Sequence, residues 1–153
     1  MLEALAKIDV LRSLPPSGLE RLAQMARLRT FAAGEALMRQ GEASESVHFI
    51  ARGRVRVERE LPGYEPIMLA DLGAGDTVGE RGVLYCEPRS ATVTALEETE
   101  TIELDTRALA MIGLHYPDVA QTLVAIVGLR QRATAIRERQ ARSRTTQRAA
   151  RAR

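Results

Sequence analysis

The feature that most constrains the fold is a series of short segments with alternating apolar and polar residues, separated by glycine turns, over residues 28–105. The clearest segment, residues 54–59, alternates strictly, which is typical of a half-buried strand with one face in solvent. Pro62-Gly63 follows it as a hairpin signal. The predicted strands cover residues 28–31, 36–39, 47–50, 54–59, 66–72, 90–95 and 99–104. About eight short strands at even spacing predict an eight-stranded antiparallel jelly-roll barrel.

The stretch before these strands is helical in pattern. Residues 1–14 predict a short helix, which Pro15-Pro16 ends. A second helix is expected from Pro16 to about residue 27, because proline is favoured in the first helical turn. Ser17 and Glu20 offer another start for this helix, as a capping box. The fold class is therefore mainly β with flanking helices.

Two helices are expected to close the chain. Asp105 or Thr106 caps the first, which runs to about residue 115, and Pro117 begins a second that reaches at least residue 139. Helical spacing places one set of residues on a single face of the second helix: Val119, Leu123, Val127, Arg130 and Thr134. A neighbouring stripe, called here the outer stripe, consists of Ile126, Leu129, Ala133 and Ile136. The barrel can cover one stripe, and the other fits either the core or the same helix of a second copy, which predicts a homodimer.

Composition limits the class of protein. The 153 residues suit one domain, and the one cysteine, Cys86, allows no disulfide within the chain. The first ten residues carry Glu3, Lys7 and Asp9, so they do not form a signal peptide. No apolar run is long enough to span a bilayer, so we expect a cytoplasmic location. The net charge is +2, but residues 137–153 hold seven arginines and one glutamate. Nucleic-acid binding is thus expected, if anywhere, only at this basic tail.

Residues 79–92, called here the cassette, carry the chemistry of a small nucleotide site. Gly79 and Gly82 allow backbone to approach a ligand, and a short helical turn between them presents free N–H groups. Arg89 can donate two parallel hydrogen bonds to a phosphate. Glu80 is an acceptor for a sugar hydroxyl. The cassette therefore offers one end for a phosphate and another for a sugar.

The cassette resembles the phosphate-binding cassette of the cyclic nucleotide-binding domain family. The positions that match the family pattern are Gly79, Glu80, Gly82, Leu84, Pro88, Arg89, Ser90, Ala91 and Thr92. The resemblance implies that Glu80 binds the ribose 2′-hydroxyl and Arg89 the cyclic phosphate. Backbone N–H groups near Gly82 and Ser90, with the Ser90 hydroxyl, would complete the phosphate site. Arg81 departs from the pattern, which more often has an apolar residue there; it is kept as a candidate ligand residue, with a solvent-facing or helix-packing role as the alternative.

The resemblance extends to the closing helix, which aligns without gaps with that of the bacterial cyclic-AMP receptor subfamily. Arg130 then falls where relatives have an arginine that reaches the ribose-binding glutamate, and Thr134 where they have a threonine that contacts adenine. The pair of Ser90 and Thr134 favours cyclic AMP over cyclic GMP. The candidate ligand-binding residues are Gly79, Glu80, Arg81, Gly82, Arg89, Ser90, Ala91, Arg130 and Thr134. The implied function is a sensor whose closing helix moves when ligand binds, with no metal and no catalysis.

Other functions stay open at this stage. A metal-dependent jelly-roll enzyme needs clustered histidines, whereas His48 and His115 lie in different elements. The fold could serve without ligand as an interaction or dimerisation module for an unknown effector, or belong to a transcription regulator whose helix-turn-helix domain is missing or atypical. The basic tail is interpreted as a solvated helix extension, a nucleic-acid or acidic-partner site, or a lipid contact.

The expected organisation is a binding domain over residues 1–140 followed by a tail. The domain consists of N-terminal helices (1–27), a β-roll (28–105) with the cassette at 79–92, and C-terminal hinge and lid helices (106–140). Residues 141–153 form the basic tail, disordered in one interpretation.

Overall fold

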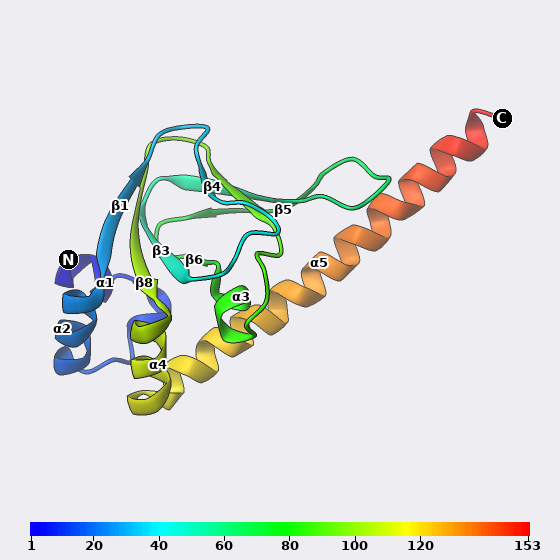
Figure 1. Cartoon of the computed structure of the whole chain (residues 1–153). Coiled ribbons are helices and arrows are strands. Elements are labelled where there is room, and N and C mark those ends of the chain that lie inside the picture. Colours follow the sequence, from blue (N-terminus) through cyan, green and yellow to red (C-terminus); the bar gives the residue numbers. More distant parts are fainter.

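The computed structural model describes all residues 1–153 and contains two four-stranded antiparallel sheets (Figure 1). One sheet has the order β1-β8-β3-β6 and the other the order β2-β7-β4-β5. The strands are β1 (Arg27–Phe31), β2 (Ala36–Met38), β3 (Ser46–Arg52), β4 (Arg54–Arg59), β5 (Ile67–Gly73), β6 (Thr77–Val78), β7 (Thr92–Ala95) and β8 (Thr99–Asp105). The prediction of an eight-stranded jelly roll with N-terminal helices and a long C-terminal helix is confirmed.

Individual strands differ in small ways from the sequence prediction. The sequence predicted no strand at residues 77–78, but the two-residue strand β6 lies there and pairs with β3. Strand β7 begins at Thr92 instead of residue 90. The break between β3 and β4 is at Gly53, whose φ of +97° is a left-handed value that favours glycine. A Cβ at Gly53 would also lie 2.6 Å from the carbonyl oxygen of Glu98, so the turn requires glycine.

The helices are α1 (Leu2–Ala6), η1 (Asp9–Leu11), α2 (Pro16–Met25), α3 (Glu80–Leu84), α4 (Thr106–His115) and α5 (Pro117–Arg151). The single helix expected over residues 1–14 is wrong, because α1 and the short 3₁₀ turn η1 share that stretch. The capping box at Ser17 and Glu20 is also wrong: Pro15 is the N-cap of α2 and no side chain caps it. At α4 the Asp105 side chain accepts a hydrogen bond from the N–H of Ala108, which confirms that cap.

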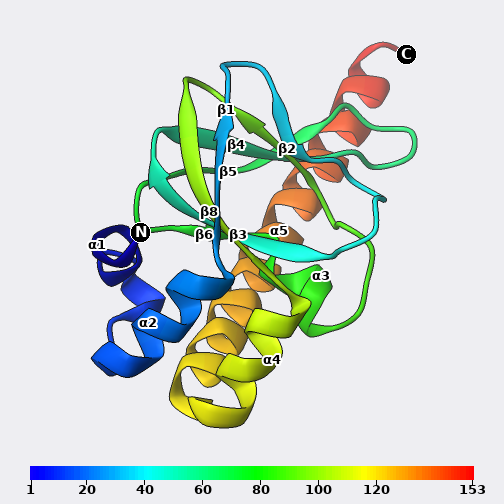
Figure 2. The ribbon, with the colours of Figure 1, turned by 60° about the vertical axis from the view of Figure 1, so that its left-hand side comes forward.

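The main core joins the N-terminal helices to the roll and to the closing helices. Its fully buried side chains include Leu5, Leu22, Phe49, Ile102 and Ile112, which come from α1, α2, β3, β8 and α4. A smaller cluster of Met38, Ile50, Val55, Val78 and Val93 fills the space between the two sheets. Figure 2 shows α1, α2 and α4 gathered at one end of the roll, where α5 begins. The core therefore fixes the start of α5 beside the roll.

Helix α5 is much longer than the core that holds it. Val119, Leu123 and Val127 on one face are buried, as the spacing predicted, and the helix then continues for 24 further residues beyond Val127 to Arg151. Of the interpretations offered for the basic tail, the structure has the helix extension: residues 141–151 continue α5 away from the roll (Figure 1). Alanine, arginine and glutamine favour helix, which accounts for this continuation.

None of the helices is by itself both long enough and apolar enough to cross a bilayer. Only α4 and α5 taken as a pair pass a test of length and composition, and they meet at an angle of 118°.

Candidate functional site

The site is built around α3, a helix of five residues that follows β6. Gly79 is its N-cap and has a left-handed φ of +85°. A Cβ on Gly79 would lie 2.5 Å from Nη1 of Arg89 and 3.0 Å from the Met38 side chain. The turn thus needs glycine both for its backbone angle and for the close approach of Arg89.

Arg89 lies beside this turn and is buried, with 7% of its surface exposed. Its Nη1 donates to the carbonyl oxygen of Gly79 at 3.0 Å, and its Nη2 donates to the carbonyl oxygen of Ser46 at 2.8 Å. Burial lowers the pKa of the Arg89 guanidinium, and the charge of Glu42 is the strongest opposing influence. Two backbone carbonyls therefore hold a positive charge in a fixed position inside the cassette.

Glu80 is the second buried charge of the cassette, with 3% of its surface exposed. Its Oε1 accepts a hydrogen bond from Nη1 of Arg130, which also donates to the carbonyl oxygen of Thr77 at 2.6 Å. Its Oε2 is buried and has no hydrogen-bond partner. Burial raises the pKa of the Glu80 carboxyl, and the charge of Arg130 partly offsets that effect. The carboxylate is therefore fixed by α5 on one side and has an acceptor oxygen free on the other.

Gly82 marks a second close approach within α3. A Cβ there would collide with the Ser44 hydroxyl and would lie 2.8 Å from the carbonyl oxygen of Glu87. The Ser44 Oγ is itself buried without a hydrogen-bond partner. Unpaired polar groups of this kind are unusual inside proteins and mark places where a ligand can supply the missing partner. The Oε2 of Glu80 and the Oγ of Ser44 are two such groups, one on α3 and one beside it.

The structure brings most of the remaining candidate residues to the same region. Ser90 is half-buried at the end of the cassette, and Ala91 is buried where the chain enters β7. Arg81 forms an ion pair with Glu87 at 3.1 Å, which ties the two ends of the α3 segment together. Thr134 is half-buried on the same face of α5 as Arg130, one turn further on, and makes no side-chain hydrogen bond.

Sequence reasoning missed three residues that help to form the site. Ser46 and Thr77 contribute backbone carbonyl oxygens, to Arg89 and Arg130 respectively. Ser44 contributes its hydroxyl next to Gly82. A backbone carbonyl has the same chemistry in every residue, so only the pairing of distant strands could reveal the first two. The structure has no group of three or more His, Cys, Asp or Glu residues that could hold a metal ion.

Both the sequence and the fold of this chain are similar to those of known proteins. Residues 28–114 match a family model described as the cyclic nucleotide-binding domain. The chain is 25% identical over 132 residues to the CRP-like cAMP-activated global transcriptional regulator of Mycobacterium tuberculosis, an alignment that covers 86% of this chain and 59% of the regulator. The chain therefore spans less than two thirds of the length of that relative.

Two solved structures share the architecture. The catabolite activator protein of Thermus thermophilus aligns with a TM-score of 0.73 and 28% identity, over 83% of this chain and 60% of that one. The regulatory subunit of a cAMP-independent protein kinase A from Trypanosoma brucei aligns with a TM-score of 0.76 and 26% identity, over 82% of this chain and 45% of that one. The matched chains thus include both a bacterial activator and a regulatory subunit of a kinase.

Proposed function

Because the chain belongs to the cyclic nucleotide-binding domain family, we propose that it is a sensor for a cyclic nucleotide, with cyclic AMP favoured over cyclic GMP, and that binding repositions α5. The observation that carries this proposal is the buried Oε2 of Glu80, which has no partner although the carboxylate is otherwise fixed. A ribose hydroxyl is a donor of the right kind for that oxygen. The ligand would supply the hydrogen bond that the folded chain lacks.

The phosphate would lie against Arg89 and the N–H groups at the start of α3. Arg89 is already oriented by the carbonyl oxygens of Gly79 and Ser46, so little side-chain entropy would be lost on binding. Gly82 and Ser90 would contribute further N–H groups, and the Ser90 hydroxyl one more donor. Ala91 would pack against the ligand as a small buried side chain, and Arg81 would frame the site through its ion pair with Glu87.

The base would be covered by α5, through Thr134 and the aliphatic part of Arg130. Arg130 already connects α5 to Glu80, so a ligand that engages Glu80 changes the balance of contacts that position the helix. Such a change requires that the ligand bind one helix position more strongly than another. The proposed output is a change in the position of α5 that a partner can detect. The domain would run over residues 1–140, with the rest of α5 extending its lid helix.

The outer stripe of α5 supports a dimer as part of this function. Leu129 and Ile136 are 63% and 56% exposed, although both are large apolar side chains. With Ile126 and Ala133 they recur at intervals of three and four residues, the spacing of a two-stranded coiled coil. We expect Leu129→Glu to yield a monomer in sedimentation analysis under conditions where the unaltered chain is a dimer; an unchanged sedimentation coefficient would contradict this seam.

Titration calorimetry with cyclic AMP and cyclic GMP tests the ligand directly. We expect saturable heat with cyclic AMP, and a loss of about 100-fold in affinity for Arg89→Ala, since a charged bidentate contact to phosphate is removed. Arg52→Ala is the matched control, because Arg52 is exposed and pairs only with Glu98 and Glu100. Circular dichroism would establish that both variants fold. The absence of heat with either nucleotide at near-millimolar concentration would contradict the proposal.

A second function is favoured by one comparison. The Trypanosoma brucei relative is described as cAMP-independent, so a chain with this fold can act without cyclic AMP. In that case the Glu80–Arg130 ion pair would serve to lock α5 in place, and the chain would act as a ligand-free interaction module. A sample that dimerises identically with and without nucleotide, and gives no heat in the titration, would support this alternative.

A further inference from the structure

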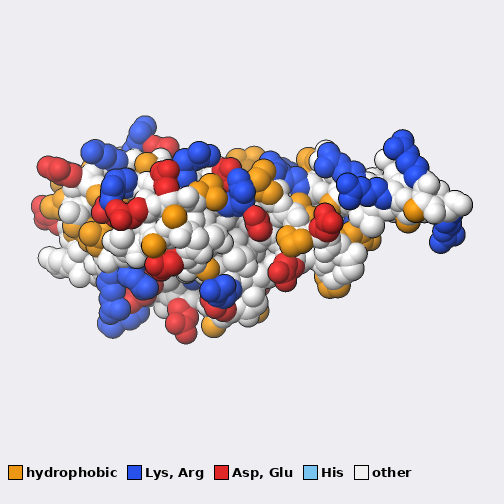
Figure 3. Space-filling view, turned by 90° about the horizontal axis from the view of Figure 1, so that it is seen from above, with side chains coloured by type: hydrophobic (Ala, Val, Ile, Leu, Met, Phe, Trp, Pro, Cys, Tyr) orange, Lys and Arg blue, Asp and Glu red, His pale blue; other side chains and the backbone are white.

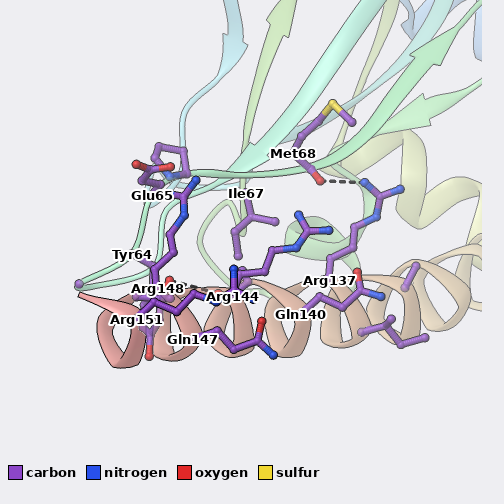
Figure 4. Close-up of a pocket in the computed structure, with 16 residues that line it drawn as sticks. Tyr64, Glu65, Ile67, Met68, Arg137, Gln140, Arg144, Gln147, Arg148 and Arg151 are labelled. Carbon is purple, nitrogen blue, oxygen red and sulfur yellow. Dashed lines mark hydrogen bonds between the residues drawn. The ribbon is translucent and has the colours of Figure 1, made fainter. Parts of the chain in front are cut away.

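A groove of about 1030 Å³ lies between the β4–β5 hairpin and the C-terminal half of α5, away from the cassette (Figure 4). Two contacts hold the hairpin and the helix together at its inner end. Arg137 donates to the carbonyl oxygen of Met68 at 2.8 Å, and Arg59 forms an ion pair with Glu138 at 2.9 Å. None of the cassette residues lines the groove, so nucleotide binding leaves its surface unused.

One wall of the groove is strongly basic. Arg144, Arg148 and Arg151 follow Arg137 at helical spacings that place all four on the same face of α5, the face that meets the hairpin. Arg144, Arg148 and Arg151 are exposed, and Arg137 is half-buried. The only acidic residue in the second half of the helix, Glu138, pairs with Arg59 of the roll, so the helix supplies no carboxylate to these arginines. Figure 3 shows the blue side chains gathered on the narrow end of the molecule, which α5 forms.

The groove also has an apolar part. Tyr64, Pro66 and the largely buried Ile67 lie on the hairpin side, and Ile136 lies on the helix side. Met68 contributes its backbone carbonyl oxygen, since its side chain points away from the helix (Figure 4). Tyr64 and Ile136 are 36% and 56% exposed. Exposed apolar side chains that share a groove with unpaired charges of one sign are typical of a surface that binds another molecule. The occupant must therefore offer both apolar and negatively charged groups.

A second copy of the chain does not meet that requirement. Continuing the heptad of the outer stripe past Ile136 gives Gln140, Ser143, Gln147 and Ala150 at the seam. In a parallel pair, Arg132 and Arg139 would then face Arg137 and Arg144 of the other copy. Like charges at these flanking positions oppose pairing, so self-association should end near Ile136 and leave the basic half of α5 free.

Nucleic acid fits less well than a peptide. Proteins that bind single-stranded nucleic acid stack its bases on aromatic side chains and attract its phosphates with basic residues. The one aromatic residue of the groove, Tyr64, already has the guanidinium of Arg142 over its ring, with Cζ 5.9 Å from the ring centre. Glu65 adds a negative charge at the groove edge, and the apolar patch would face only phosphates. A peptide with alternating apolar and acidic side chains would satisfy both surfaces.

We infer that this groove docks an acidic, amphipathic segment of a partner protein. Its carboxylates would pair with Arg144, Arg148 and Arg151, and its apolar side chains would pack against Tyr64 and Ile67 of the hairpin, which lie outside the dimer seam. Arginine is suited to this role because its guanidinium binds a carboxylate with two parallel hydrogen bonds. The inference concerns a surface outside the cassette and does not depend on nucleotide binding.

The probe is a synthetic, fluorescently labelled helical peptide of about 14 residues, with leucine at intervals of three and four and glutamate between. It is titrated against the full chain by fluorescence anisotropy, beside a polyglutamate of equal charge and a single-stranded oligonucleotide of similar length. We expect the amphipathic peptide to bind most tightly. We expect the double substitution Arg144→Glu and Arg148→Glu to weaken it at least about tenfold.

The matched control reverses two charges on the opposite face of the same helix, Arg139→Glu and Arg153→Glu. It should change peptide affinity less than about threefold, because those side chains point away from the hairpin. Heteronuclear NMR should place the shifts of bound peptide at Tyr64 and Ile67. Nucleotide titration should be the same for both variants, which separates this test from that of the cassette.

Three results would overturn the inference. The first is no saturable binding of the amphipathic peptide to the full chain at millimolar concentration. The second is an oligonucleotide or polyglutamate that binds at least as tightly as the peptide, which would indicate attraction by charge alone. The third is an equal loss of affinity in the two double variants, which would show that the hairpin side of α5 is not special.

Discussion

The buried His48 links the stability of the roll to pH. It lies on β3, two residues after Ser46, whose carbonyl oxygen accepts a hydrogen bond from Arg89. The ring is buried, its Nδ1 lies 2.9 Å from Oγ1 of Thr101, and its Nε2 lies 4.0 Å from the carboxylate of Glu103. Burial lowers the pKa of His48 from 6.5 to about 4, with Glu103 opposing and Arg89 reinforcing the change. The folded chain therefore keeps this imidazole neutral at pH values where the unfolded chain protonates it.

The direction of the effect follows from that difference. Between pH 6.5 and about 4 the unfolded state binds one proton more than the folded state, so the free energy of unfolding falls as the pH falls. Above pH 6.5 both states are neutral at His48, and the contribution is constant. The full change corresponds to about 3 kcal/mol, of which about 2 kcal/mol is lost between pH 8 and pH 5.

Urea unfolding at pH 8 and pH 5 measures this contribution, with His48→Gln as the variant. Glutamine cannot titrate but can still bond to Thr101, so the variant should lose about 2 kcal/mol less than the unaltered chain over that interval. Carboxylates that do not face His48 titrate alike in both proteins and cancel in the comparison, whereas Glu103 faces His48 and titrates as part of the measured difference. His115→Gln is the control, because His115 is exposed at the end of α4. Equal losses in the unaltered chain and in His48→Gln would refute the argument that burial keeps this ring neutral.

Three further substitutions test the site and its supports. Gly82→Ala should lower the stability by about 1–3 kcal/mol in thermal unfolding, because its Cβ would collide with the Ser44 hydroxyl; Ser44→Gly in the same chain should restore part of the loss. Asp105→Ala should lower the free energy of unfolding by about 1 kcal/mol in urea, because it removes the cap of α4. Arg130→Gln should speed amide hydrogen exchange in α5 beyond Gly128, because it removes the bonds to Glu80 and Thr77; exchange unchanged there would show that these bonds do not hold the helix.

The sequence predicted those parts of the fold that depend on local pattern. Alternation in the β4 segment reports which of its residues face the core, and Val55 is indeed fully buried. The cap at Asp105 depends on one side chain and the next three residues, so it too can be predicted. The pattern failed at β6, which is two residues long and exists because β3 offers it a partner. A strand of that length has no period of its own.

The candidate site shows the same division. Glu80 and Arg89 lie within one short segment with glycines at fixed offsets, so the sequence predicted a sugar-binding carboxylate and a phosphate-binding arginine in the same site. Arg130 was found because an uninterrupted helix preserves spacing, and the structure places it on Glu80. The carbonyl oxygens of Ser46 and Thr77 were not predicted, because their role comes from which strands pair and not from side-chain chemistry.

If ligand binding moves α5 as proposed, the length of this helix would couple the cassette to the groove. Arg151 lies 21 residues beyond Arg130, which at about 1.5 Å per residue is about 30 Å along the helix. A rotation of about 10° at Arg130 would thus move the end of the helix by about 5 Å. The hairpin opposes such a rotation through the contacts of Arg137 and Glu138. Either those contacts break or the hairpin moves with the helix, and in both cases the groove changes shape, because α5 and the hairpin are its two walls. A ligand that shifts Arg130 by a small amount would therefore alter the docking surface much more than it alters the cassette.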